Sequence, residues 1–136
     1  MAILKKFADV LNPRQVEAVG TLSGPLLILA GAGSGKTRVL TYRMANLIAQ
    51  GEATAESVLA VTFTNKAARE MEARVVKLLH ELGITLYDRM WVSTFHSTCA
   101  RILREEIHLL DYPPFFSIYD DSDQVGLIKK ILNGLN

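Results

Sequence analysis

The sequence contains few of the residues that signal an unusual architecture. Its 136 residues include one cysteine, four prolines and nine glycines, and aromatic residues make up only 7%. A single cysteine, Cys99, cannot form an intramolecular disulfide, and this fits a reducing compartment. We therefore expect a cytoplasmic protein that is stabilised by an ordinary core, for which a hydrophobic content of 49% is sufficient.

Long hydrophobic runs and a large excess of one charge are also missing. The longest obvious apolar run, residues 25–30, is much shorter than the roughly 20 residues that a membrane-spanning helix needs, so we expect no membrane partner. The first residues lack the apolar core of a secretory signal. The net charge is +1, with 13 basic and 8 acidic side chains in residues 1–104 but 2 and 6 in residues 105–136. This distribution permits a polyanionic partner without requiring one.

Helical and strand-like patterns alternate along the chain. Asn12 and Pro13 are typical of a helix start, as N-cap and first helical residue. Because strands that alternate with helices are joined by right-handed crossovers, we expect an α/β fold with a mainly parallel sheet and helices on both faces. Three or four strands make a thin sheet, so we expect a truncated domain. The predicted strands are 26–30, 57–63, 90–94 and 115–119, and the predicted helices are 13–22, 36–51, 67–82, 95–110 and one from about residue 122.

The strongest chemical signal is a glycine-rich segment between the first predicted strand and the next helix. We call residues 30–37 the phosphate loop; they read Ala30-Gly31-Ala32-Gly33-Ser34-Gly35-Lys36-Thr37. Its glycines allow backbone N–H groups to converge on phosphate oxygens, and the following helix adds its positive end. Lys36 is predicted to contact the β- and γ-phosphates of ATP, and the Thr37 hydroxyl to bind Mg²⁺. The first position is Ala30 where the strict motif has glycine.

Several segments together resemble the UvrD/PcrA/Rep group of superfamily 1 DNA helicases. The resemblance covers about residue 9 to the end of the chain. It implies a RecA-like P-loop ATPase fold, with residues 1–110 as the N-terminal part of the ATP-binding domain and 111–136 as the truncated start of an inserted helical subdomain. The segments that carry it are the phosphate loop, Leu11-Asn12-Pro13-x-Gln15, Ala60-Val61-Thr62-Phe63-Thr64-Asn65-Lys66-Ala67-Ala68, Thr94-Phe95-His96-Ser97 and Phe116-Ser117-Ile118-Tyr119-Asp120-Asp121-Ser122-Asp123-Gln124.

The resemblance also implies roles for two residues outside the phosphate loop. Gln15 matches a glutamine that reads the adenine edge, for which a carboxamide suits because it donates and accepts at once. Arg38 matches an arginine that packs on the adenine face. The alternatives are a solvated glutamine on a helix surface and a surface arginine near a helix start.

A second group of residues matches a DNA-binding track. Ligands of an open parallel sheet bind at the carboxyl ends of its strands, and Thr62, Phe63, Thr64 and Asn65 follow such an end. Thr64 and Asn65 are candidate helix caps, and Phe63 is suited to stack on an unpaired base, unless it is a core aromatic. His96 resembles a DNA-contacting histidine, the alternative being a polar residue at a helix start.

The function that the resemblance implies is an ATP-dependent 3′-to-5′ helicase or translocase on single-stranded DNA, acting in repair or replication. The Asp120-Asp121 pair, which resembles a Mg²⁺-binding acidic pair, is predicted instead to start a helix. We therefore expect this chain to bind ATP but scarcely hydrolyse it, to need the remainder of a helicase chain, and to self-associate. The alternatives are the related nuclease-coupled recombination helicases, a non-catalytic nucleotide-binding module, and another P-loop ATPase or kinase.

Overall fold

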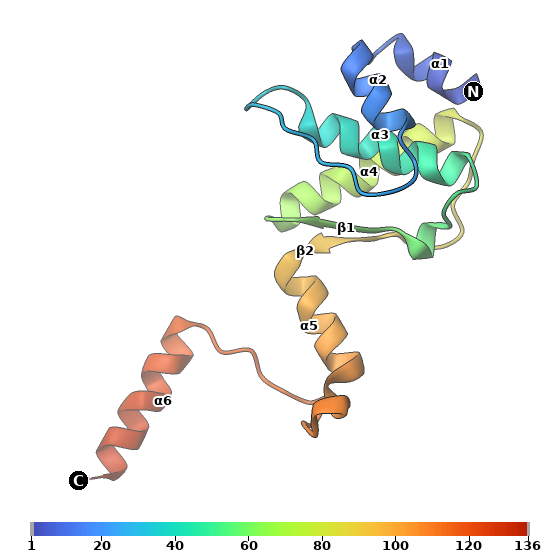
Figure 1. Ribbon diagram of the computed structural model, residues 1–136. Coiled ribbons are helices and arrows are strands. Elements are labelled where there is room, and N and C mark those ends of the chain that lie inside the picture. Colours follow the sequence, from blue (N-terminus) through green and yellow to red (C-terminus); the bar gives the residue numbers. More distant parts are fainter. Residues whose placement is uncertain (1, 136) are drawn as a thin grey trace. The chain divides into compact units, whose positions relative to one another are not determined.

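A computed structural model describes residues 2–135, which form two compact units (Figure 1). The first unit ends at Thr98, and the second begins at Cys99. The predicted division between residues 110 and 111 stays a prediction. The first unit contains α1 (Ala2–Ala8), α2 (Pro13–Gly20), α3 (Lys36–Ala49), the 3₁₀ turn η1 (Ala55–Ser57), β1 (Leu59–Thr62), α4 (Asn65–Glu81), β2 (Trp91–Thr94) and the first residues of α5 (Phe95–Glu106). The second contains the rest of α5, the 3₁₀ turn η2 (Ile107–Leu110) and α6 (Asp121–Gly134).

Helices α2 and α4 begin where short polar side chains cap them. Asn12 caps α2 as predicted: its side chain accepts a hydrogen bond from the Gln15 N–H, and Pro13 is the first helical residue. Thr64 caps α4 by accepting from the N–H of Ala67 at 3.1 Å. These bonds satisfy donors that a helix start leaves without an intrahelical partner.

The sheet has two parallel strands among the described residues, with Leu59 opposite Trp91 and Thr62 opposite Thr94. The connection through α4 explains this arrangement, because a parallel pair needs a crossover helix. Helix α4 packs against both strands, and α3 packs against α4. Ala60 is buried, whereas its strand neighbours Leu59 and Val61 are exposed. We predicted helices on both faces of the sheet. In this unit, helices cover one of its two faces.

Packing between helices and sheet builds the core of the first unit. A stripe of α4, Met71, Val75 and Leu79, is almost fully buried, as its three- and four-residue spacing predicts. The buried polar Asn46 of α3 donates from Nδ2 to the Val19 carbonyl at 3.1 Å, which ties α3 to the end of α2. The buried apolar side chains are Phe7, Leu11, Val19, Val39, Met44, Ala45, Ala55, Val58, Ala60, Ala68, Met71, Val75, Leu79 and Met90.

Two predicted strands are not present in the structure. Residues 25–30 form neither a strand nor a helix, and Leu27 and Leu29 are 81% and 87% exposed. Residues 115–119 are likewise not in a strand. A strand requires a neighbour with which to exchange hydrogen bonds, and among the described residues β1 and β2 pair only with each other. The apolar run at 26–29 therefore has the composition of a buried strand without the partner that would make it one.

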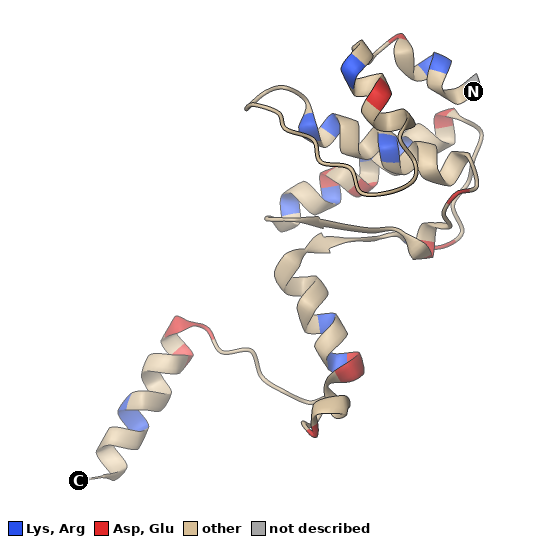
Figure 2. Ribbon diagram, viewed as in Figure 1, with Lys and Arg blue, Asp and Glu red and all other residues tan. Residues whose placement is uncertain are grey.

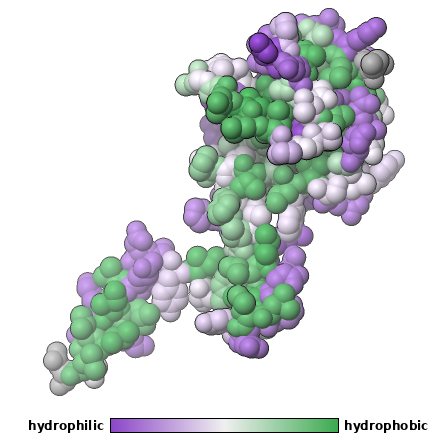
Figure 3. Space-filling view, in the orientation of Figure 1, coloured by the Kyte–Doolittle hydropathy of each residue, from purple (hydrophilic) through white to green (hydrophobic). Residues whose placement is uncertain are grey.

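The second unit starts its last helix with an acidic cap. Asp120 accepts from the Ser122 hydroxyl at 2.7 Å and from the Asp123 N–H at 2.9 Å, and these bonds hold the pKa of the Asp120 carboxyl below its usual range. This is the helix-start role predicted for Asp120. The apolar side chains of α6 remain about half exposed and form the hydrophobic surface that Figure 3 shows along this helix: Val125, Leu127, Ile128, Ile131 and Leu132.

Candidate nucleotide site and nucleic-acid edge

The phosphate loop forms a tight, exposed turn that leads into α3. Gly33 and Gly35 have φ of 74° and 88°, in the left-handed region that favours glycine. The Ser34 hydroxyl donates to the Gly31 carbonyl at 2.7 Å and closes the turn. Glycine at these positions is therefore required by the backbone conformation.

Lys36 folds its side chain back over the loop. Its ammonium donates to the carbonyls of Ala30 at 3.0 Å and Gly31 at 2.6 Å. An ammonium has three N–H donors, and the oxygens of a phosphate chain are stronger acceptors than neutral carbonyls. The positive charge of Lys36 therefore lies beside the loop backbone, in position to bind an anion.

The start of α3 differs from the capped starts of α2, α4 and α6. Its N-cap is Gly35, which has no side chain with which to satisfy the first-turn N–H groups. Thr37 is exposed in this turn and carries the hydroxyl that suits Mg²⁺. Backbone donors, an ammonium and a hydroxyl are the donor set that a magnesium-bound phosphate chain requires.

Gln15 contacts the loop and stays partly exposed to solvent. Its Nε2 donates to the Ser34 carbonyl at 3.1 Å, and its Oε1 accepts from the Asn12 N–H at 3.0 Å. Its role toward an adenine stays a prediction. Sequence reasoning missed the contact with Ser34, because it joins residues 19 positions apart.

Arg38 contacts a different neighbour. Its guanidinium lies 5.8 Å from the ring centroid of Tyr42, one helical turn further along α3. It lines a pocket of about 320 Å³ between α3 and α4, together with Thr41, Tyr42, Arg74, Lys77, Leu78 and Glu81. The phosphate loop and Gln15 do not line this pocket. Gln15 and Arg38 are nevertheless both neighbours of Gly35, where an added Cβ would lie 2.9 Å from Gln15 Nε2 and 3.8 Å from Arg38 Cβ.

The carboxyl ends of β1 and β2 carry the residues predicted for a DNA track. Because Thr62 and Thr94 are register partners, Phe63 and His96 follow the same edge of the sheet, as predicted. Phe63 is 100% exposed, which excludes the core-aromatic alternative. His96 is also exposed. The phosphate loop follows no paired strand, so its place at this edge stays a prediction.

Two threonines organise this edge. The Thr62 hydroxyl donates to the Thr64 carbonyl at 3.0 Å and fixes the turn that carries Phe63. Thr94 caps α5, because its Oγ1 accepts a hydrogen bond from the Ser97 N–H at 3.2 Å. Asn65 is the first residue of α4, so Thr64 rather than Asn65 is the cap.

The same edge carries residues that sequence reasoning missed. Lys66 lies in the first turn of α4, which has no acidic residue, and Arg69 follows in the next turn beside Glu70; Figure 2 shows basic residues at the starts of α3 and α4. Positive charge there opposes the helix dipole, and this mismatch is the signal that could have found them. Phe95 is 63% exposed with its ring 6.5 Å from that of His96.

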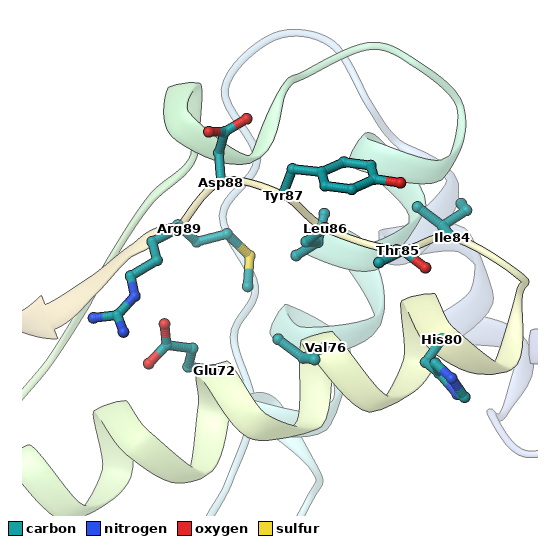
Figure 4. A pocket seen from close by; sticks show the side chains of 10 residues that line it. Glu72, Val76, His80, Ile84, Thr85, Leu86, Tyr87, Asp88 and Arg89 are labelled. Atoms are coloured by element: carbon teal, nitrogen blue, oxygen red, sulfur yellow. The ribbon is translucent and has the colours of Figure 1, made fainter.

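Another pocket lies at the amino end of β2. It has a volume of about 390 Å³ and lies between α4 and the segment 84–90, which leads into the strand (Figure 4). Glu72, Val76 and His80 of α4 line one side of it. None of the predicted site residues lines this pocket, so it is separate from the nucleotide site and the carboxyl edge.

The class of protein can now be stated. Residues 11–136 match the UvrD/REP helicase N-terminal domain, and the chain therefore belongs to this family, whose fold is RecA-like. This membership accounts for the phosphate loop and for the parallel strands joined through α4. Among the described residues, no helix is long and apolar enough to cross a membrane.

Individual relatives are ATP-dependent DNA helicases by name. The chain is 53% identical over 126 residues to the ATP-dependent DNA helicase PcrA of Bacillus subtilis (strain 168), which is 93% of this chain and 16% of that protein. It is 50% identical over the same length to the PcrA of Staphylococcus aureus (strain COL), covering 17% of it. The chain thus spans about a sixth of the length of these relatives.

Proposed function

We propose that this chain is the ATP-binding portion of a cytoplasmic DNA helicase that moves 3′ to 5′ along single-stranded DNA. In this proposal residues 1–110 belong to the RecA-like domain, and residues 111–136 begin an inserted helical subdomain. The observation that carries it is the phosphate loop, where an uncapped helix start, the Lys36 ammonium and the Thr37 hydroxyl meet. The family membership supports the same function.

The loop residues bind and orient the nucleotide. The N–H groups of the loop and of the first turn of α3 hold the phosphate chain, and Lys36 exchanges its carbonyl partners for phosphate oxygens. Thr37 holds Mg²⁺, which neutralises charge on the phosphates when it is bound. Gln15 and Arg38 are the proposed contacts to the adenine. The Asp120 carboxylate caps α6.

The carboxyl edge of β1 and β2 holds single-stranded DNA. A fully exposed aromatic ring at Phe63 is suited to stack on a base, and exposed His96 lies on the same edge. The backbone turn of Thr62, Thr64 and Asn65 supplies polar groups for a phosphate. Lys66 adds a positive charge beside them.

Calorimetric titration of ATP with Mg²⁺ into the chain tests the proposal. We expect weak binding to the wild type and at least a tenfold loss for Lys36→Ala, because a charge-assisted contact is removed. Lys6→Ala is the matched control, because that lysine is exposed on α1 and lines none of the pockets described above. Equal affinity of wild type and Lys36→Ala refutes the assignment.

A further inference from the structure

Gln15 connects two parts of the first unit through a single carboxamide. Its Oε1 accepts from the Asn12 N–H at 3.0 Å and completes the capping box that starts α2. Its Nε2 donates to the Ser34 carbonyl at 3.1 Å. One end of this side chain is therefore fixed to a helix start, and the other end holds the phosphate loop.

The contact with Ser34 controls the direction of a neighbouring donor. In a trans peptide the carbonyl of one residue and the N–H of the next point in opposite directions. The Ser34 carbonyl points toward Gln15, so the Gly35 N–H points away from it. Holding this one carbonyl therefore sets the direction of an N–H in the turn that leads into α3.

The surroundings of Gly35 show how closely the amide packs on the loop. A Cβ atom at Gly35 would lie 2.9 Å from Gln15 Nε2, and its φ of 88° is in the left-handed region. Glycine at this position thus permits both the turn and the approach of Gln15. The loop conformation and the position of the amide depend on each other.

We propose that Gln15 is a positioning residue for the phosphate loop. By holding the Ser34–Gly35 peptide, Gln15 directs the Gly35 N–H toward a phosphate chain, whatever base that chain carries. The inference rests on the proposed nucleotide site and deepens it. A carboxamide has a second N–H and a second carbonyl lone pair, so the same side chain keeps one donor and one acceptor for an adenine.

The proposal predicts a loss of affinity that does not depend on the base. Titrating ATP, GTP and inorganic tripolyphosphate, each with Mg²⁺, into wild type and Gln15→Ala separates the two roles, because tripolyphosphate has no base. We expect Gln15→Ala to weaken tripolyphosphate and GTP by a factor of about three to ten, the effect of losing one hydrogen bond, and to weaken ATP by at least that factor because the adenine contact is lost as well. A loss confined to ATP overturns the proposal.

Asn12→Ala is the matched control, because it breaks the same capping box and leaves the contact between Gln15 and Ser34 in place. We expect it to lower the thermal unfolding midpoint about as much as Gln15→Ala does, without weakening tripolyphosphate binding. The Gly35 amide resonance of the ligand-free chain should shift in Gln15→Ala and stay in place in Asn12→Ala. An equal loss of affinity in both variants shows a general helix effect and overturns the proposal.

Lys36→Ala distinguishes failure of this inference from failure of the nucleotide site. If Lys36→Ala weakens tripolyphosphate binding and Gln15→Ala does not, the positioning role is wrong and the site stands. If Lys36→Ala binds tripolyphosphate as tightly as the wild type, the phosphate chain is not at this loop and both proposals fail.

Discussion

Replacing Phe63 by alanine should weaken single-stranded DNA binding without destabilising the fold. The side chain is 100% exposed, so its removal leaves no cavity and the free energy of unfolding should change by less than about 0.5 kcal/mol. Stacking of one base on an aromatic ring contributes about 1–3 kcal/mol, which corresponds to about a 5- to 150-fold loss of affinity.

Fluorescence anisotropy with a labelled oligothymidine measures this loss, and Tyr87→Ala is the matched control. Tyr87 is 94% exposed in the same unit, but it precedes the amino end of β2, whereas the proposed DNA track lies at the carboxyl ends of the strands. Its removal should therefore not affect DNA binding. The salt dependence gives a second readout. Phe63→Ala should keep the wild-type slope of log K against log salt, whereas Lys66→Ala should reduce it by about 0.7. DNA affinity that is unchanged in Phe63→Ala, or lost equally in Tyr87→Ala, refutes the proposed track.

Three further predictions concern the rest of the chain. Val75→Ala should lower the free energy of unfolding by about 2 kcal/mol in denaturant titrations, because Val75 is 0% exposed, whereas Val76→Ala, at a residue 45% exposed, should have little effect. The pKa of the Asp120 carboxyl lies below the usual value of 3.8, so the stability that this cap gives to α6 is present above about pH 4 and is lost as the pH falls through the folded-state pKa. Amide exchange in α6 should show this loss in the wild type but not in Asp120→Asn. Light scattering should show concentration-dependent association that Ile128→Lys reduces, since the half-exposed apolar face of α6 is then interrupted; a monomer at all concentrations contradicts this.

The sequence predicts local features of this protein well. The caps at Asn12 and Asp120 and the start of α3 at Lys36 follow from side-chain chemistry within a few residues. The buried stripe of α4 follows from its periodicity. Each of these features is decided by neighbours in the chain, which a single sequence contains.

Features that depend on distant partners were missed or wrong. The run at 26–29 has the composition of a strand, but pairing is decided by a neighbouring strand and not by composition. No element was assigned to α1, although Phe7 is buried with its ring 4.8 Å from that of Tyr42. In the site, the hydrogen bond from Gln15 to Ser34 requires α2 to lie beside the loop, and no local pattern shows this.

The proposed nucleotide site requires residues 31–37 to hold the phosphate chain. Amide chemical shifts of the labelled chain, recorded while ATP and Mg²⁺ are added, measure this residue by residue. We expect the largest shifts at Gly33, Gly35, Lys36 and Thr37, with smaller shifts at Gln15, and we expect Lys36→Ala to suppress them. Shifts that centre on α6 or on the pocket beside residues 84–90, and that persist in Lys36→Ala, would contradict it.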